Sequence, residues 1–357
     1  MDDLAGNALR EISYAFDAPP GPGEALEVAE GVLWLRIPLP MRPDHINIYA
    51  LDDGDGWTIV DTGLNTGRVR AAWDKLLAGP LAGRPIRRVI VTHHHPDHVG
   101  NAGWFQTDHG AELWATRTTW LFSRMLMLDE QPAPPEELIA FWRRAGMSEE
   151  ILAERIETRP MNFADVLAPM PLGFRRIAQD DVVVAGGRRW RVEIGHGHAP
   201  EHAMLWCLDE PLVIAGDQVL PTITSNLGTY ATEPEADPVG EWVATCERLL
   251  PMARADQIVM PGHQRPFRGL DVRLQELIDH ETENAEKLLA ALRTPRSACD
   301  CFDVLYGRRI GKSEYGLALV EAVAHMNHLH GRGLVSREMS PEGVWLFCAT
   351  GGDVSGT

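Results

Sequence analysis

One short stretch, residues 89–100, constrains this chain more than any other. It reads Val-Ile-Val-Thr-His-His-His-Pro-Asp-His-Val-Gly, so that four histidines and an aspartate fill five of six successive positions behind a β-branched run. The run predicts a buried strand, which the Pro and the Gly then end. Burying so many polar groups is costly unless each has a partner, and a metal ion satisfies them together. The stretch predicts a metal site; a His-rich surface loop is the alternative.

Three later strand-like runs also end in residues that bind metals. They are the run before Gly195–His202, which contains His198, the run 212–217, which ends in Asp217, and the run 258–263, which ends in His263. Each of these polar residues lies next to Gly or Pro. Ligand-binding loops converge at the carboxyl ends of strands in α/β sheets. We therefore expect four strand ends to meet at one shared site.

The composition is that of a soluble globular protein. The chain has 357 residues and a formal net charge of −18, which disfavours nucleic acid and anionic membranes as partners. Its five cysteines are odd in number and show no disulfide or CxxC zinc pattern, so we expect reduced thiols. The N-terminus lacks the apolar region of a signal peptide, and no apolar run is long enough for a membrane span. We expect a cytoplasmic protein with a small-molecule substrate.

The order of the expected elements divides the chain into three regions. Residues 1–27 form a lead-in that ends near a Pro/Gly cluster. Residues 28–268 alternate strands and helices, which predicts an α/β layered fold, and they carry a helical insertion at about residues 111–175. Residues 269–357 are mostly helical and end in a small hairpin, which suggests a winged-helix-like appendage. We expect the insertion to line or cover the site.

These motifs resemble those of a known family. The ordered set His93-x-His95-x-Asp97-His98, His198, Asp217 and His263 is similar to that of the metallo-β-lactamase-fold superfamily of dinuclear metallohydrolases, which includes glyoxalase II-like enzymes. Asp61, in Ile-Val-Asp-Thr-Gly, matches the first motif of that family. The resemblance covers about residues 28–268 and implies an αββα sandwich. The tail, with Ala324–Leu329 before Gly331–Val335, is similar to the C-terminal appendage of a glyoxalase-like subgroup.

The resemblance implies a ligand set for two divalent metal ions. The first ion would be held by His93, His95 and His198, the second by Asp97, His98 and His263, with Asp217 bridging both. We also assign Asp97 a catalytic role. Mixed nitrogen and oxygen ligands suit Zn²⁺ best, with Mn or Fe as alternatives. A hydroxide that bridges the two ions would then be the nucleophile, since metal binding lowers the pKa of water to about 7.

Other polar residues near these motifs have weaker assignments. We expect Asp61 to orient a ligand and not to bind a metal. Side chains alternate on extended backbone, so His94 should point away from its neighbours. His202 is expected to be structural, with an orienting role as the alternative. His196 flanks the same motif and receives no role.

Two residues after Asp217, Asn226 and Tyr230, are candidates to donate to an oxyanion. The spacing of Tyr230 from Asp217 does not match the tyrosine of the lactonases in the superfamily. Three histidines of the tail, His325, His328 and His330, lie close together on an expected helix. They predict a packed helix face, because they are far in sequence from the other ligands.

The leading functional interpretation is hydrolysis of a small ester-like substrate, either a thioester or a lactone. The alternative is a phosphodiesterase or endoribonuclease with the same dinuclear site. From residue 287 on, eight Lys and Arg face seven Asp and Glu, which is not a basic footprint for nucleic acid. We therefore expect the tail to be a packing or homodimerisation element. The Asp217 bridge argues against β-lactam hydrolysis, and the complete ligand set argues against a degenerate, non-catalytic member.

Overall fold

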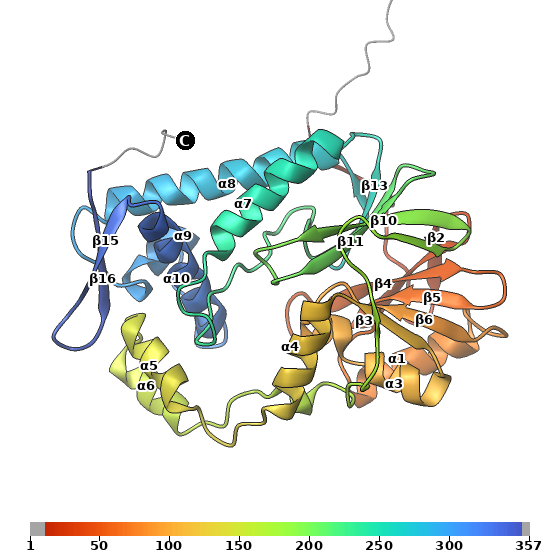
Figure 1. Cartoon of the computed structure of the whole chain (residues 1–357), viewed down its shortest axis with the longest axis horizontal. Helices are drawn as coiled ribbons and strands as arrows, with labels where there is room; N and C mark the ends of the chain where they lie inside the picture. Colours follow the sequence, from red (N-terminus) through yellow and green to blue (C-terminus); the bar gives the residue numbers. More distant parts are fainter. Residues whose placement is uncertain (1–10, 352–357) are drawn as a thin grey trace, which may run out of the picture.

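The computed structural model describes residues 11–351 and contains two seven-stranded sheets with helices on their outer faces (Figure 1). The first sheet is antiparallel from β2 to β5 and parallel from β5 to β8. Its strands, in spatial order, are β2 (Ala25–Ala29), β3 (Val32–Pro38), β4 (His45–Asp52), β5 (Trp57–Val60), β6 (Ile86–Ile90), β7 (Glu112–Ala115) and β8 (Arg175–Arg176).

The second sheet is antiparallel except where β12 and β13 run parallel. Its strands, in spatial order, are β1 (Ser13–Tyr14), β14 (Phe267–Arg268), β13 (Ile258–Pro261), β12 (Leu212–Gly216), β11 (His202–Cys207), β10 (Arg188–Gly195) and β9 (Val182–Ala185). Each sheet thus has one parallel section, and the polar motifs follow β6, β10, β12 and β13.

Three apolar layers hold the sandwich together. Side chains such as Trp34, Tyr49 and Trp190 are fully buried between the sheets. Helices α1 (Gly67–Ala78) and α3 (Ala102–His109) cover the first sheet, and α7 (Pro238–Leu249) and α8 (Leu270–Ala291) cover the second. This arrangement confirms the predicted αββα fold class. Helix α1 begins after the capping residue Thr66, whose side chain accepts from the N–H of Val69.

Strand β6 shows how local sequence positions the metal-binding motif. Val89 packs toward the helices while Ile90 packs between the sheets, so the strand is buried on both faces, as in parallel sheets. Beyond the strand, Pro96 takes the first position of the short helix α2 (Pro96–Val99), where a missing N–H is not a loss. Thr92 to His95 therefore form a tight connection at the edge of the sandwich.

The helical insertion begins later than predicted. Residues 112–115 lie within the expected range but form β7, because they pair in parallel with β6. The helices that follow are α4 (Arg117–Leu128), α5 (Glu136–Arg144), α6 (Glu149–Ile156) and the 3₁₀ turn η1 (Phe163–Asp165). α4 packs near the first sheet, whereas Phe141 and Trp142 of α5 and Leu152 of α6 share a core with the C-terminal helices. The insertion thus bridges two parts of the molecule.

The C-terminal region is a small helical unit with a hairpin (Figure 1). It consists of the second half of α8 followed by η3 (Cys299–Cys301), α9 (Phe302–Tyr306), α10 (Tyr315–Gly331), β15 (Val335–Met339) and β16 (Trp345–Ala349). The short turn η2 (Leu250–Met252) lies earlier in the chain, directly after α7. The boundary predicted at residue 269 precedes a continuous helix. Leu270, Leu274 and Leu277 of α8 pack on the second sheet, while Ala285 and Leu288 pack in the C-terminal core.

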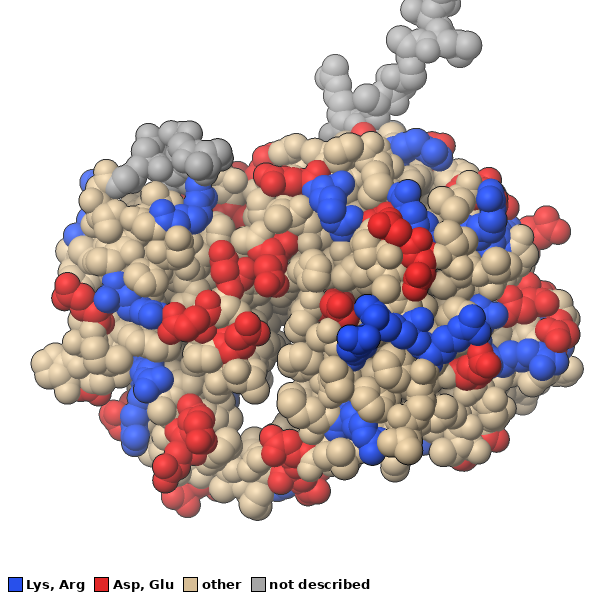
Figure 2. Space-filling view, in the orientation of Figure 1, with Lys and Arg blue, Asp and Glu red and all other residues tan. Residues whose placement is uncertain are grey.

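The lead-in is more ordered than a loose segment in the part that the structure describes. Residues 1–10 of the predicted lead-in lie outside the described residues, but Ser13–Tyr14 pairs with β14 and Ala25–Ala29 forms the edge strand β2. Among residues 11–351, no helix is long and apolar enough to cross a bilayer. On the face drawn in Figure 2, acidic and basic side chains are interspersed over the C-terminal region, whereas a band of basic side chains crosses the sandwich. A hollow separates the two parts.

Candidate metal centre

The structure brings all seven predicted ligands to one edge of the sandwich. In the described part of the chain, possible ligand atoms lie within 4.8 Å of one another in three groups: His93, His95 and His198; His93, His98 and Asp217; Asp97, His98 and His263. They come from the segment after β6, the loop after β10, the end of β12 and the end of β13. Four strand ends therefore meet, as the sequence predicts.

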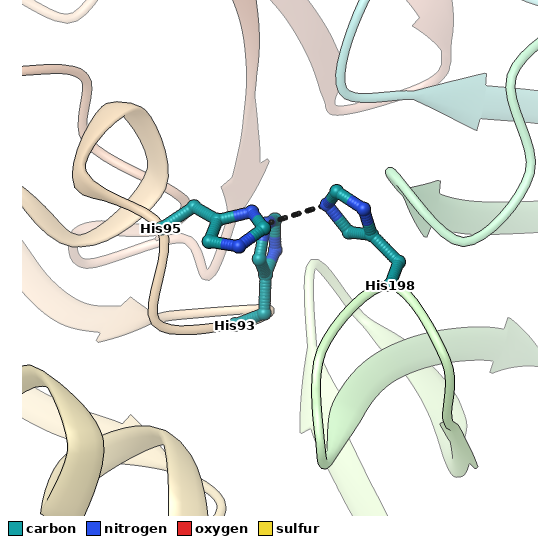
Figure 3. A group of neighbouring side chains, drawn as sticks. All are labelled: His93, His95 and His198. Atoms are coloured by element: carbon teal, nitrogen blue, oxygen red, sulfur yellow. Dashed lines mark hydrogen bonds between the residues drawn. The ribbon is translucent and has the colours of Figure 1, made fainter. Parts of the chain in front are cut away.

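Three imidazoles form what we call the first group (Figure 3). Nε2 of His93 lies 2.9 Å from Nδ1 of His95 and 3.3 Å from Nε2 of His198. Burial, followed by the neighbouring imidazoles, lowers the pKa of His93 and His95 well below the usual value. Burial also lowers the pKa of His198. These rings are therefore neutral near pH 7, the form in which imidazole binds metals.

Two imidazoles and a carboxylate form the second group, Asp97, His98 and His263. Oδ2 of Asp97 lies 3.4 Å from Nε2 of His263 and 3.7 Å from Nε2 of His98. Burial alone would lower the pKa of His263, but Asp217 and Asp97 outweigh it and raise that pKa to about 10. Asp217 and Asp61 likewise outweigh burial and raise the pKa of His98. This half of the site holds charged pairs.

Asp217 touches both groups. Its Oδ2 lies 3.1 Å from Nε2 of His263, 3.3 Å from Nε2 of His98 and 3.7 Å from Nε2 of His198. Burial opposes its ionisation, but His263 and His98 lower its pKa well below the usual value. A buried, ionised carboxylate at this position can serve two cations at once.

Oxygen atoms behind the site fix four of the rings. The Nδ1 atom of His93 lies 3.0 Å from Thr92 Oγ1, and that of His98 lies 2.8 Å from Asp61 Oδ2. The Nδ1 atom of His198 donates to the Asn226 carbonyl at 3.0 Å, and that of His263 to the His45 carbonyl at 2.7 Å. Each ring therefore directs Nε2 inward, which is the arrangement that metal-binding histidines need.

Two buried atoms show that the site fits metal ions. Nε2 of His98 and Oδ1 of Asp217 are buried and have no hydrogen-bond partner among the described residues. A buried polar atom left in this way costs free energy, and a cation at the centre would remove that cost. The neutral first group and the ionised carboxylates of the second group supply the mixed donor set that divalent metal ions prefer.

The structure gives contacts to the residues with weaker assignments. Asp61, at a positive φ of 65°, accepts hydrogen bonds from N and Oγ1 of Thr92 as well as lying against His98. His202 stacks on His93, and its Nε2 accepts from the main-chain N–H of Asp217 at 3.0 Å. His94 belongs to none of the three ligand groups and lies against Phe122, with ring centroids 5.2 Å apart.

The two candidate oxyanion donors have different surroundings. The side-chain amide of Asn226 donates to Glu321 and to the Leu317 carbonyl, so it is already engaged. Tyr230 is half exposed, and His196 contacts the Pro200 carbonyl. The tail histidines also pair within the helical region, His325 beside Glu281, His328 with Asp237 and His330 with Val335.

Sequence reasoning missed two supports of the site, Thr92 and the main chain of His45. In the sequence, Thr92 is indistinguishable from the other β-branched residues of the run before His93. Nothing in the pattern marks a main-chain carbonyl as an acceptor. The sequence did contain a signal for close packing at the site, namely the glycines that precede His263 and Asp217. Gly262 leaves room for Asp217, because a Cβ there would collide with its Oδ1 atom. Gly216, at a positive φ of 51°, likewise leaves room for His202.

Comparison with known proteins identifies the family. Residues 41–289 match the model of the metallo-beta-lactamase superfamily. The chain belongs to this superfamily. Residues 285–350 match its C-terminal domain model, described as metallo-beta-lactamase-like. These matches confirm the predicted family, its C-terminal appendage and the enzyme class, a metallo-hydrolase.

Similar proteins from bacteria extend this result. A beta-lactamase domain protein from Burkholderia ambifaria has 33% identity and a TM-score of 0.88, over 95% of this chain and 98% of that one. A metallo-beta-lactamase family protein from Thermus thermophilus has 26% identity and a TM-score of 0.75, over 90% of this chain and all of the other. The probable metallo-hydrolase YqjP of Bacillus subtilis is 22% identical over 86% of this chain and 94% of its own length.

A linear primary-alkylsulfatase from Pseudomonas is a more distant relative of the chain. It is 24% identical over 63% of this chain, and the match covers 42% of the alkylsulfatase. Proteins named for different activities are thus similar to this chain.

Proposed function

We propose that this metallo-hydrolase holds two divalent metal ions, most suitably Zn²⁺, and hydrolyses a small ester-like substrate, a thioester or a lactone. The observation that carries the proposal is the sharing of Asp217 between two groups of ligands, one built of three imidazoles. Mn and Fe are the alternative metals for a mixed nitrogen and oxygen donor set.

When bound, two such ions supply a Lewis acid for the scissile carbonyl and a water whose pKa is lowered to about 7. The residues of the chain then have defined tasks. His93, His95 and His198 present neutral nitrogens, while Asp97 and Asp217 present carboxylates. His202 holds the main chain of Asp217 in place through its Nε2 atom. No protein nucleophile is needed, and Asp97 keeps its proposed catalytic role as a ligand beside the reacting groups.

The balance of charge supports a small substrate over nucleic acid. The whole chain carries a net charge of −18, and from residue 287 on it has eight basic and seven acidic residues. Figure 2 likewise has no continuous basic surface over that region on the face drawn. Binding of a phosphate backbone depends on Lys and Arg contacts. The same site would serve a phosphodiester, which makes phosphodiester hydrolysis the competing outcome of the test.

The test is a substrate panel with Zn²⁺-reconstituted protein. The panel contains an acyl-CoA, S-lactoylglutathione, an acyl-homoserine lactone, bis-p-nitrophenyl phosphate and, because of the Pseudomonas relative, dodecyl sulfate. We expect turnover of a thioester or the lactone that a chelator abolishes and that Asp217→Ala lacks. The exposed variant Asp256→Ala is the control and should retain turnover. Turnover of the phosphodiester or the sulfate alone would contradict the proposed substrate class.

A further inference from the structure

We propose that Glu321, on α10 of the C-terminal region, is a positioning residue for the metal centre. It holds the side chain of Asn226, and the main-chain carbonyl of Asn226 in turn holds the ring of His198. The inference rests on the proposed function, since it takes His198 to be a metal ligand. It gives the C-terminal region a part in the active site.

The link consists of three hydrogen bonds in series. Nδ1 of His198 donates to the carbonyl oxygen of Asn226 at 3.0 Å. Nδ2 of Asn226 donates to Oε2 of Glu321 at 3.1 Å and to the carbonyl of Leu317 at 3.3 Å. The hydroxyl of Tyr306, on α9, donates to the same Oε2 at 2.9 Å. Glu321 therefore connects both C-terminal helices to the ring of His198.

The segment that contains Asn226 depends on such contacts. Residues 217–237 form neither helix nor strand, and they connect β12 to α7. Segments without ladder hydrogen bonds have low local stability unless other groups hold them. A second contact to α10 lies nearby, where the N–H of Thr229 donates to the Val320 carbonyl at 3.0 Å. α10 is thus the element against which this part of the segment is placed.

The environment of Glu321 explains why its two donors matter. Burial raises the pKa of Glu321 to about 7, while the hydrogen bonds from Tyr306 and Asn226 oppose that rise. A buried carboxyl group is costly unless its oxygens are paired. Because Oε2 receives both donors, the position of Asn226 is defined relative to two helices at once.

The consequence for His198 is a fixed tautomer and ring orientation. With Nδ1–H donating to Asn226, the lone pair on Nε2 faces Nε2 of His93 across 3.3 Å. Loss of Glu321 would leave the amide of Asn226 with only its longer hydrogen bond to the Leu317 carbonyl, and would let the carbonyl that holds His198 move. Changes in groups behind a ligand typically reduce metal affinity about 10- to 100-fold.

The test measures Zn²⁺ affinity by competition with a chromophoric chelator in the wild type and three variants. We expect Glu321→Ala to weaken the site of the first group by about 10- to 100-fold. Glu321→Gln should stay near wild type, because an amide oxygen can accept both hydrogen bonds. The matched control is His330→Ala, which breaks another contact of α10, to the Val335 carbonyl of the C-terminal hairpin at 3.1 Å. It should leave the affinity unchanged.

Each outcome separates this inference from the proposed function. A wild type that binds no Zn²⁺ overturns both. A wild type that binds two ions, with unchanged affinity in Glu321→Ala, overturns only the inference. Equal weakening in His330→Ala would assign the effect to helix docking, and normal affinity with lost turnover in Glu321→Gln would assign Glu321 another task. If Glu321→Ala does not fold, Tyr306→Phe removes one donor and should weaken affinity less; no change there contradicts the link.

Discussion

The two halves of the metal centre share Asp217 but differ in charge. In the first group, burial and neighbouring rings keep His93 and His95 neutral. In the second group, carboxylates raise the pKa of His98 and His263, so both rings are doubly protonated and positively charged in the absence of metal. One half is thus ready to bind a cation, and the other must first lose protons.

The supports behind the two halves also differ. Asp61 and the carbonyl of His45, both within the sandwich, hold His98 and His263. His198, by contrast, depends on Asn226 and through it on α10. The rings of the second group are thus held by residues of the αββα core, whereas the first group is completed by the C-terminal region. Three predictions test this difference, and a fourth tests the packing of α8 against α10. They follow in order of their expected effect on the metal centre.

Asp217→Ala removes the carboxylate that both halves share. Metal-based stabilisation of a transition state is worth several kcal/mol, so turnover should fall on the order of 1000-fold. Metal content should drop as well, because both sites lose the anionic ligand that they share. The measurement is metal content by mass spectrometry together with turnover of the active panel substrate. Retention of two ions and full turnover in this variant would refute the shared site.

Asp61→Asn removes the direct support of the second group, the contact between Asp61 and His98, and reaches the first group only through Thr92. Asn tolerates the positive φ of 65° at this position, so the backbone should keep its conformation. The amide cannot accept from both Thr92 and His98 as the carboxylate does, and the affinity of the second site should fall about 10- to 100-fold. Stepwise Zn²⁺ titration measures this. The distinction between the halves fails if both sites weaken equally.

Proton release on metal binding should differ between the two sites. The pKa of His263 is about 10, so this ring must lose a proton at pH 7 before it can bind a metal. The neutral His93 and His95 need lose none. Calorimetric titration in buffers of different ionisation enthalpy counts the protons released. We expect more from the second group and a steeper loss of its affinity as pH falls; equal release from both sites would contradict the assignment.

The packing of α8 against α10 should make the stability of the protein depend on pH. Glu281 of α8 is buried beside His325 of α10, and burial raises its pKa to about 8. The folded state therefore holds a proton that the unfolded state loses near pH 4.5. The contribution of Glu281 to the free energy of unfolding is therefore fully present below pH 4.5. It decreases as the pH rises from 4.5 to about 8, by at most about 1.4 kcal/mol per pH unit.

Glu281→Gln should remove this dependence and leave metal affinity unchanged. Its melting temperature should exceed that of the wild type at pH 8 by more than at pH 5. The control is Glu283→Gln on the same helix, an exposed position. A constant difference between Glu281→Gln and the wild type across this range would show that Glu281 is not the titrating group.

The sequence was sufficient to predict the αββα fold and to select residues that the structure brings together. The reason is local, since each group of candidate ligands directly follows an apolar strand and includes or adjoins a Gly or Pro. His93 to His98, Asp217 and His263 could therefore be placed at strand ends without knowledge of the packing.

Features that depend on distant packing could not be predicted. Glu321 lies far along the chain from Asn226, and only the docking of α10 on residues 217–237 brings them together. The boundary at residue 269 was placed before a helix that in fact packs on both parts of the molecule. Helix α7 was not predicted, although Asp237 and Pro238 provide its cap and first residue.

The number of metal ions per chain tests the central claim most directly. Protein reconstituted with Zn²⁺ and freed of excess metal by gel filtration should contain two ions per chain, one for each group around Asp217. A value of one or fewer would contradict the dinuclear site.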